Sequence, residues 1–157
     1  MCSAVPRGIQ PAELENYLHE QIPLTRAMDL SVVESGARVV LEAPLAPNAN
    51  HLGTAFGGSL HTLPTLACYT ALWILLREHD VEGHVVVKRS QASYLQPVTG
   101  VLRAVCVRPP AEITARFISD LRRHKRARME LDAIVTSQNE RPAVTFIGTF
   151  VALIKQP

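Results

Sequence analysis

A loop of small residues leads directly into a long apolar segment between Asn48 and Leu76. The loop contains Gly53, Gly57 and Gly58, which let the backbone approach another molecule closely. Ser59 follows, and we expect it to cap a helix that begins there. The first N–H groups of a helix have no partner within it and lie at the positive end of its dipole. This pattern predicts a site that stabilises negative charge on an oxygen at the helix start.

Few titratable side chains lie near this helix start. His61 is the nearest, and imidazole exchanges a proton readily at neutral pH, so His61 is the candidate general base. The alternative is that His61 only hydrogen-bonds a neighbour. No carboxylate occurs between Glu42 and Glu78. Asn50 could hold a water molecule or a carbonyl oxygen, or it could cap a turn. His51 is expected to be solvated.

The composition restricts the class of protein. A chain of 157 residues with 47% hydrophobic content can enclose one buried helix in a single domain, 1–157. A net charge of +2 gives no general attraction to nucleic acid. Cys2, Cys68 and Cys106 are far apart and outside any CxxC spacing, which predicts neither a disulfide framework nor a zinc site. We expect no metal, a core position for Cys68 and a cytoplasmic location.

The apolar segment is also long enough to cross a membrane. Gly57–Leu76 contains 20 residues without a formal charge, about the length that spans a bilayer. Its polar and helix-breaking residues would be costly in hydrocarbon; they are His61, Thr62, Pro64, Thr65 and Thr70. We therefore expect a buried helix and no membrane span. Met1–Gln10 lacks the apolar core of a secretory signal.

Apolar periodicity and turn residues predict the other elements. Two further helices are expected, one over Pro11–Glu20 and one that carries Ile113, Phe117 and Leu121. Strands are expected over Leu24–Glu34, Arg38–Leu45, His84–Leu95, Val101–Arg108, the alternating run Arg128–Val135 and Ala143–Lys155. Ser35 and Gly36 should join the first two strands as a hairpin.

An antiparallel sheet that curls around the apolar helix satisfies this order of elements. A helix that is apolar on every side needs cover on most sides, and a strongly twisted sheet supplies it, which gives an α+β fold. The strand Val85–Tyr94 has few charges and no internal proline. It is a candidate to pair with a second copy across a two-fold axis, so a homodimer is expected.

Two motifs at this separation resemble a known family. They are GTAFGGSLHTL over Gly53–Leu63, preceded by Asn48 and Asn50, and YLQPVTG over Tyr94–Gly100. Together with the strand order, they are similar to hotdog-fold proteins of the "putative thioesterase" type known from the YiiD C-terminal domain. The resemblance extends over roughly Gln21–Ile154.

The resemblance implies hydrolysis of an acyl thioester, carried on coenzyme A or acyl carrier protein, at the interface of a homodimer or dimer of dimers. The carbonyl oxygen would lie near the amides of Gly57 or Gly58, with Phe56 and Ser59 beside the substrate. Coenzyme A would be part of the substrate, and no other cofactor is implied. An activated water would complete the reaction.

The chain departs from better-known hotdog thioesterases at two positions. Those enzymes carry His at the position of Phe56 and an acidic residue at the position of Thr65. Thr65 could orient a water but cannot take its proton at neutral pH. A non-catalytic acyl-CoA-binding or scaffold domain is therefore an alternative hypothesis. A hotdog dehydratase is a third.

Two further groups of residues are candidate substrate contacts. Ser90 and Ser93 lie on the predicted third strand and could face the site of a partner subunit. Arg122 and Arg123 belong to a dense basic run that ends at Arg128. They could bind the phosphates of coenzyme A or an acidic carrier protein. The alternative for this run is a solvated turn before a strand.

Overall fold

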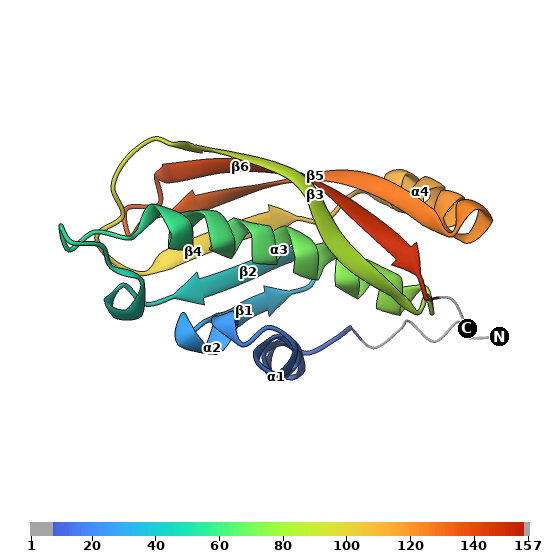
Figure 1. Ribbon diagram of the computed structural model, residues 1–157, viewed down its shortest axis with the longest axis horizontal. Coiled ribbons are helices and arrows are strands. Elements are labelled where there is room, and N and C mark those ends of the chain that lie inside the picture. Colours follow the sequence, from blue (N-terminus) through green and yellow to red (C-terminus); the bar gives the residue numbers. More distant parts are fainter. Residues whose placement is uncertain (1–7, 156–157) are drawn as a thin grey trace.

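The computed structural model describes residues 8–155. Residues 1–7 and 156–157 lie outside this part, and with them Cys2 and most of the Met1–Gln10 segment. The described chain forms one six-stranded sheet in the order β1-β2-β4-β5-β6-β3, and every pairing is antiparallel. The sheet curls around α3, as predicted (Figure 1).

The helices are α1 (Pro11–Gln21), α2 (Leu24–Ala27), α3 (Gly57–Glu78) and α4 (Ala111–His124), with a 3-10 turn over Ala46–Asn48. The strands are β1 (Ser31–Ser35), β2 (Arg38–Ala43), β3 (Gly83–Tyr94), β4 (Leu102–Val107), β5 (Arg126–Thr136) and β6 (Pro142–Ile154). β1 and β3 are the two edges of the sheet. The predicted order of elements is therefore confirmed, except in the first strand.

The prediction of a strand over Leu24–Glu34 is wrong in its first half, which forms α2 and a turn. Pro23 has φ of −55° and ψ of −27°, which starts a helical turn. The hydroxyl of buried Thr25 donates to the carbonyl of Ile22 at 2.8 Å and stabilises that turn. Asp29 then adopts a positive φ of 54°, so the chain leaves the helix and enters β1.

The long helix begins three residues earlier than predicted. Gly57 is its first residue and Phe56, with extended backbone angles, precedes it without a side-chain cap. Ser59 is therefore the third residue of α3, and its prediction as the cap is wrong. Pro64 consequently lies inside the helix and cannot donate to the carbonyl of Leu60.

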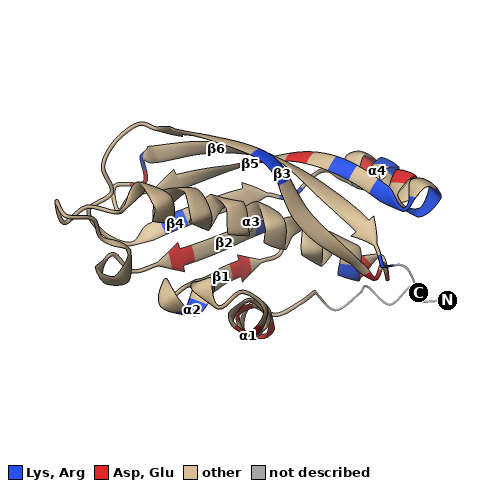
Figure 2. Cartoon of the chain, viewed as in Figure 1, with Lys and Arg blue, Asp and Glu red and all other residues tan. Residues whose placement is uncertain are grey.

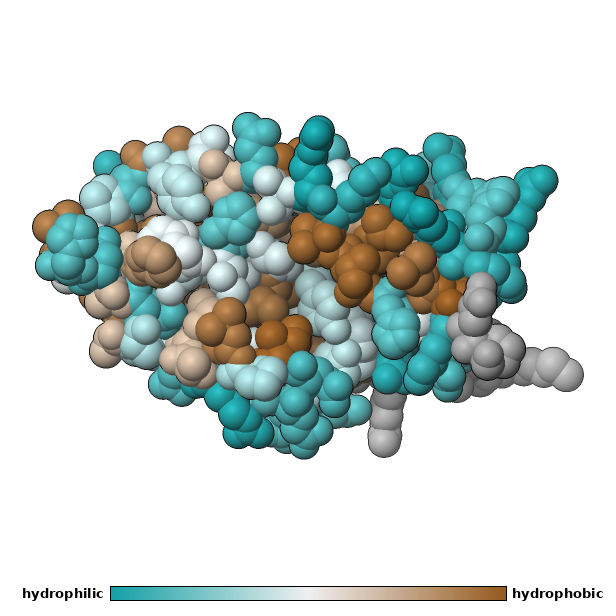
Figure 3. Space-filling view, in the orientation of Figure 1, coloured by the Kyte–Doolittle hydropathy of each residue, from teal (hydrophilic) through white to brown (hydrophobic). Residues whose placement is uncertain are grey.

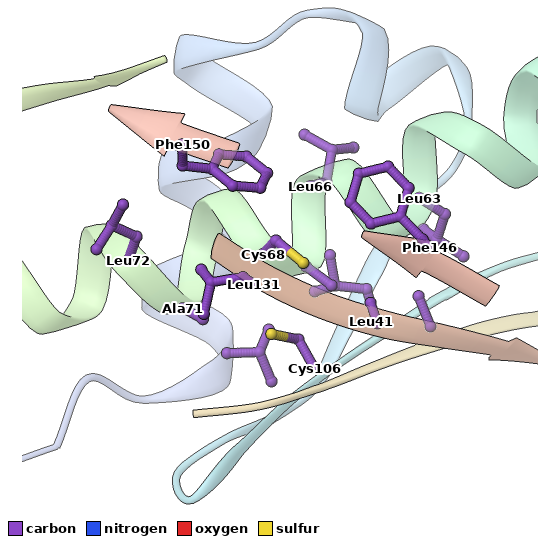
Figure 4. Packing of buried hydrophobic residues seen from close by; sticks show 14 of the residues in the cluster. Leu41, Leu63, Leu66, Cys68, Ala71, Leu72, Cys106, Leu131, Phe146 and Phe150 are labelled. Carbon is purple, nitrogen blue, oxygen red and sulfur yellow. The ribbon is translucent and has the colours of Figure 1, made fainter. Parts of the chain in front are cut away.

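The core lies between α3 and the concave face of the sheet. Twelve of the 22 residues of α3 are buried, and they pack against strand residues such as Phe146 and Phe150 (Figure 4). Cys68 is fully buried in this core, as predicted. The neighbouring thiol of Cys106 and burial raise the pKa of the Cys68 thiol far above its usual value, which leaves it uncharged and unreactive.

By length and composition α3 could cross a membrane, but 67% of its most apolar window is buried within the domain. It is therefore the core helix of this fold. At its far end, Glu78 forms an ion pair with Arg108, which follows β4. This pair ties the last turn of α3 to the sheet.

One side of α3 is only partly covered by the sheet. It consists of residues at four-residue spacing, here called the open stripe: His61, Thr65, Tyr69, Trp73 and Arg77. Tyr17 of α1 covers part of it, since its ring stacks on Trp73 with centroids 4.1 Å apart. Its hydroxyl lies 3.0 Å from that of Tyr69. The stripe remains partly accessible near His61.

Replacement of Leu72 by Ala tests the importance of the core around α3. Leu72 is fully enclosed, so we expect Leu72→Ala to lower the free energy of unfolding by about 2–5 kcal/mol in urea denaturation. Leu52→Ala is the control because that side chain is 73% exposed in the loop, and its effect should be small. Equal effects of the two variants would contradict this description of the core.

Candidate functional site

Asn50 organises the loop before α3. Its Oδ1 accepts from the backbone N–H groups of Leu52 and Thr54 at 2.9 and 3.2 Å. Its Nδ2 donates to Thr54 Oγ1 at 2.9 Å and to the carbonyl of Ala55 at 3.4 Å. This geometry is the turn-capping alternative considered for Asn50. Both ends of the amide are thus engaged in shaping the loop.

The buried side chain of Asn48 anchors the loop to neighbouring segments. Asn48 was not among the predicted site residues. It is 2% exposed, and its Nδ2 donates to the carbonyls of Met28 and Pro44 at 2.9 and 2.8 Å. Its own backbone carbonyl accepts from the N–H of Phe56 at 2.7 Å. The residue before α3 is therefore held by a buried polar anchor. The only sequence signal for this role is the pair of asparagines, Asn48 and Asn50, in the loop.

Three backbone N–H groups are free at the start of α3. The first helical hydrogen bond runs from the N–H of Leu60 to the carbonyl of Phe56 at 3.0 Å. The amides of Gly57, Gly58 and Ser59 have no hydrogen-bond acceptor among residues 8–155. All three residues are partly exposed. The positive end of a 22-residue helix thus presents unpaired donors to the surface.

Two exposed aromatic rings flank these amides. The ring of Phe56, 56% exposed, covers Gly58 so closely that a Cβ there would lie 2.2 Å from Phe56 Cε1. Tyr94, 53% exposed at the end of β3, donates its hydroxyl to the carbonyl of Gly57 at 3.3 Å. Sequence reasoning missed Tyr94 as a site residue, although it begins the YLQPVTG motif. The rings leave an apolar rim around the polar helix start.

His61 and Ser90 come together at this end of the molecule. His61 Nε2 lies 2.9 Å from Ser90 Oγ, which joins the first turns of α3 to β3. The imidazole also meets the ring of Phe146 edge-on, with centroids 5.4 Å apart. No carboxylate forms an ion pair with His61 in the described part of the chain. The pair is therefore an imidazole and a hydroxyl without the acid of a triad.

Thr65 follows His61 on the open stripe. Its hydroxyl donates to the carbonyl of His61 at 2.7 Å, one turn back in the helix. Thr62 donates in the same way to the carbonyl of Gly58 at 2.9 Å. Each hydroxyl oxygen keeps lone pairs that can accept from a water molecule. Thr65 can therefore hold a water beside His61 without exchanging a proton.

The predicted Ser93 is not brought together with Ser90. Successive residues of a strand point to opposite faces, so Ser93, three residues beyond Ser90, lies on the other face of β3. Ser93 is exposed and pairs with Thr145 of β6.

Arg122 and Arg123 lie at the opposite end of α3, where charged residues gather on α4 (Figure 2). A helix of 22 residues is about 33 Å long. Arg122 Nη2 donates to the carbonyl of His79 at 2.8 Å and so helps to close the end of α3. The basic run is not a turn throughout. Its first residues end α4, Lys125 has a φ of 60°, and Arg126 starts β5.

Comparison with known proteins places this geometry in a family. The family described as "Putative thioesterase (yiiD_Cterm)" matches residues 11–154. A protein of unknown function from Chlorobaculum tepidum is similar at 28% identity with a TM-score of 0.88, over 94% of this chain and 99% of that one. A structure described as a putative thioesterase from Shewanella oneidensis is similar at 26% identity with a TM-score of 0.82, over 91% and 96%. The hotdog fold predicted from the two motifs is confirmed.

Removal of the Asn48 side chain tests its role as the anchor of the loop. Asn48→Ala leaves the carbonyls of Met28 and Pro44 without this donor, so we expect a loss of about 1–3 kcal/mol in the free energy of unfolding. Asn139→Ala, in the exposed β5–β6 turn, should change it by about 0.5 kcal/mol or less. The anchor would be refuted by a loss no larger than that of the control in chemical denaturation.

Proposed function

The chain belongs to the "putative thioesterase" family of the YiiD C-terminal type, and we propose that it hydrolyses an acyl thioester at the start of α3. The thiol carrier in this proposal is coenzyme A or an acyl carrier protein. The proposal is carried by one observation. Free backbone donors of Gly57, Gly58 and Ser59 lie within about one helical turn of the His61–Ser90 pair.

The free amides supply the electrostatic part of the reaction. When water attacks a thioester carbonyl, the carbonyl oxygen gains negative charge. Donors that are already aligned stabilise this charge without reorganisation, and one such donor is often worth about 3–4 kcal/mol. Gly57 suits this role because the absence of a side chain lets the acyl group approach its N–H group, and Gly58 leaves room for the ring of Phe56 beside the site. Phe56 and Tyr94 would contact the acyl chain.

His61 carries the proton transfers in this proposal, and Ser90 orients its ring. If Nε2–H donates to Ser90 Oγ, the lone pair of Nδ1 is free to accept a proton from water. The water oxygen then bonds to the carbonyl carbon, the carbon–sulfur bond breaks, and the imidazolium returns the proton to the departing thiolate. The products are a carboxylic acid and a thiol. Thr65 orients the water through a lone pair of its hydroxyl.

A second function is favoured by a specific observation. The position of Thr65 lacks the carboxylate expected of better-known hotdog thioesterases, and its hydroxyl is engaged with the carbonyl of His61. A domain without a sufficient base would bind an acyl thioester at the same amides without turnover. Release of free thiol from a panel of acyl-CoAs separates the two functions.

The working unit in this proposal is a homodimer formed through β3. This strand is an edge of the sheet and exposes Val86 and Val87 by 48% and 46%. Figure 3 shows apolar side chains gathered over the middle of β3. Pairing with a second copy would continue the sheet and cover these side chains. It would also close the open stripe near His61 against water. Free buried thiols in Cys68 and Cys106 suit a reducing cytoplasm.

Replacement of His61 tests the proposed base. His61→Ala should lower kcat for acyl-CoA hydrolysis by about 10²- to 10⁴-fold, because water loses its proton acceptor. Ser90→Ala should give a smaller decrease, since the imidazole remains but loses its partner. His124→Ala, at the end of α4, is the matched control and should retain the wild-type rate. A His61→Ala enzyme with undiminished kcat would exclude this mechanism, and binding without thiol release by the wild type would favour the second function.

Replacement of Val87 tests the dimer. Val87→Glu places two like charges near the proposed two-fold axis, so we expect the dimer to dissociate at micromolar concentration in sedimentation equilibrium. Val107→Glu is the control because Val107 is 67% exposed on β4, away from that edge. A monomeric wild-type protein, or a Val87→Glu variant that remains dimeric, would contradict the proposed interface.

A further inference from the structure

A pocket of about 340 Å³ lies between α1, the last turns of α3 and the start of β3. This volume is within the usual range for small-molecule pockets, about 300–1,000 Å³. It is distinct from the helix start within one subunit, because Gly57 and Arg77 are 20 residues apart on α3, or about 30 Å. The pocket is not used in the proposed hydrolysis.

The charges in the pocket favour an anion. Arg77, His84 and Lys155 line it together with one carboxylate, Glu82. Within residues 8–155, neither Arg77 nor Lys155 forms an ion pair. Their hydrogen-bond donors are therefore available to a ligand, and guanidinium groups bind phosphate through paired N–H donors. A lining with two cations and a carboxylate is unsuited to an acyl chain.

Aromatic side chains form one wall of the pocket and hold a cation in place. Tyr17 and Trp73 both line it, and their rings are stacked at 4.1 Å with an interplanar angle of 26°. The guanidinium carbon of Arg77 lies 5.0 Å from the centroid of the Trp73 ring. This cation–π contact restrains Arg77 before any ligand arrives. An aromatic wall beside the restrained Arg77 suits a flat base that carries phosphate.

We propose that this pocket binds the phosphorylated adenosine portion of a nucleotide. The link to coenzyme A rests on the proposed function and its dimer. Antiparallel pairing of two β3 strands brings the start of one strand, with His84, beside the end of the other, with Tyr94. Tyr94 contacts Gly57 in its own subunit. The pocket of one subunit would then hold the nucleotide of an acyl-CoA whose thioester lies at the helix start of its partner.

Trp73 provides the readout for the test, because it is the single tryptophan of the chain. Titration with adenosine 3′,5′-bisphosphate should change its fluorescence saturably. Arg77→Gln and Lys155→Gln should each raise the apparent Kd by about tenfold, because each removes a charged donor. Arg116→Gln removes an exposed cation of α4 outside the pocket and should leave Kd unchanged. Arg77 contacts Trp73, so its replacement could change the emission directly. Lys155→Gln tests the same site without removing that contact.

Several outcomes would overturn the proposal. No saturable change at millimolar nucleotide, or an unchanged Kd in both pocket variants, would exclude the site. Equal affinity for inorganic phosphate would exclude recognition of the nucleoside. ADP or ATP binding more tightly than the bisphosphate and coenzyme A would support a nucleotide site but exclude the link to coenzyme A. His61→Ala should bind the bisphosphate with the wild-type Kd, so failure of hydrolysis and failure of nucleotide binding are separate results.

Discussion

The need to cover one long uncharged helix determines the rest of this structure. Twelve buried residues of α3 require apolar partners, and the strongly curled sheet supplies them from five of its strands. A helix enclosed in this way can expose only its ends and one stripe. Its far end is tied by Glu78 to Arg108 and by the carbonyl of His79 to Arg122. Its near end is left with free amides and the small-residue loop, so the candidate chemistry is concentrated there.

The fold could be predicted from the sequence largely because its elements have strong periodic signals. The alternation of polar and apolar residues from Arg128 to Val135 corresponds to the alternation of exposed and buried residues along β5. The uncharged run of α3 supplies the buried helix of the core. The first strand was predicted too long because α2 is a single turn of four residues, which is too short to show a helical repeat of apolar residues. Its start depends on Pro23 and on the hydrogen bond of Thr25. The start of α3 was misplaced because the residue before it, Phe56, has no side chain that can cap a helix, so the sequence carries no capping signal there.

The candidate site was predictable in part. Unpaired amides at Gly57 and Gly58 could be expected from residue type, and the role of His61 as a base stays a prediction. The contact between His61 and Ser90 joins residues 29 apart in sequence and depends on how β3 lies along α3. Local patterns carry no information on such a contact. The anchoring role of Asn48 was missed for the same reason, since its partners are backbone carbonyls of other segments.

The contact of Phe56 with Gly58 couples two positions during the divergence of this sequence. A methyl group at position 58 would overlap the ring as it stands, with only 2.2 Å between the carbons. A lineage can therefore acquire a side chain at position 58 only if residue 56 becomes smaller or its ring turns toward solvent. The reverse exchange, a small residue at 56, removes this restriction on 58. The two sites should vary together among relatives, and this covariation would arise from sterics even where neither residue touches substrate.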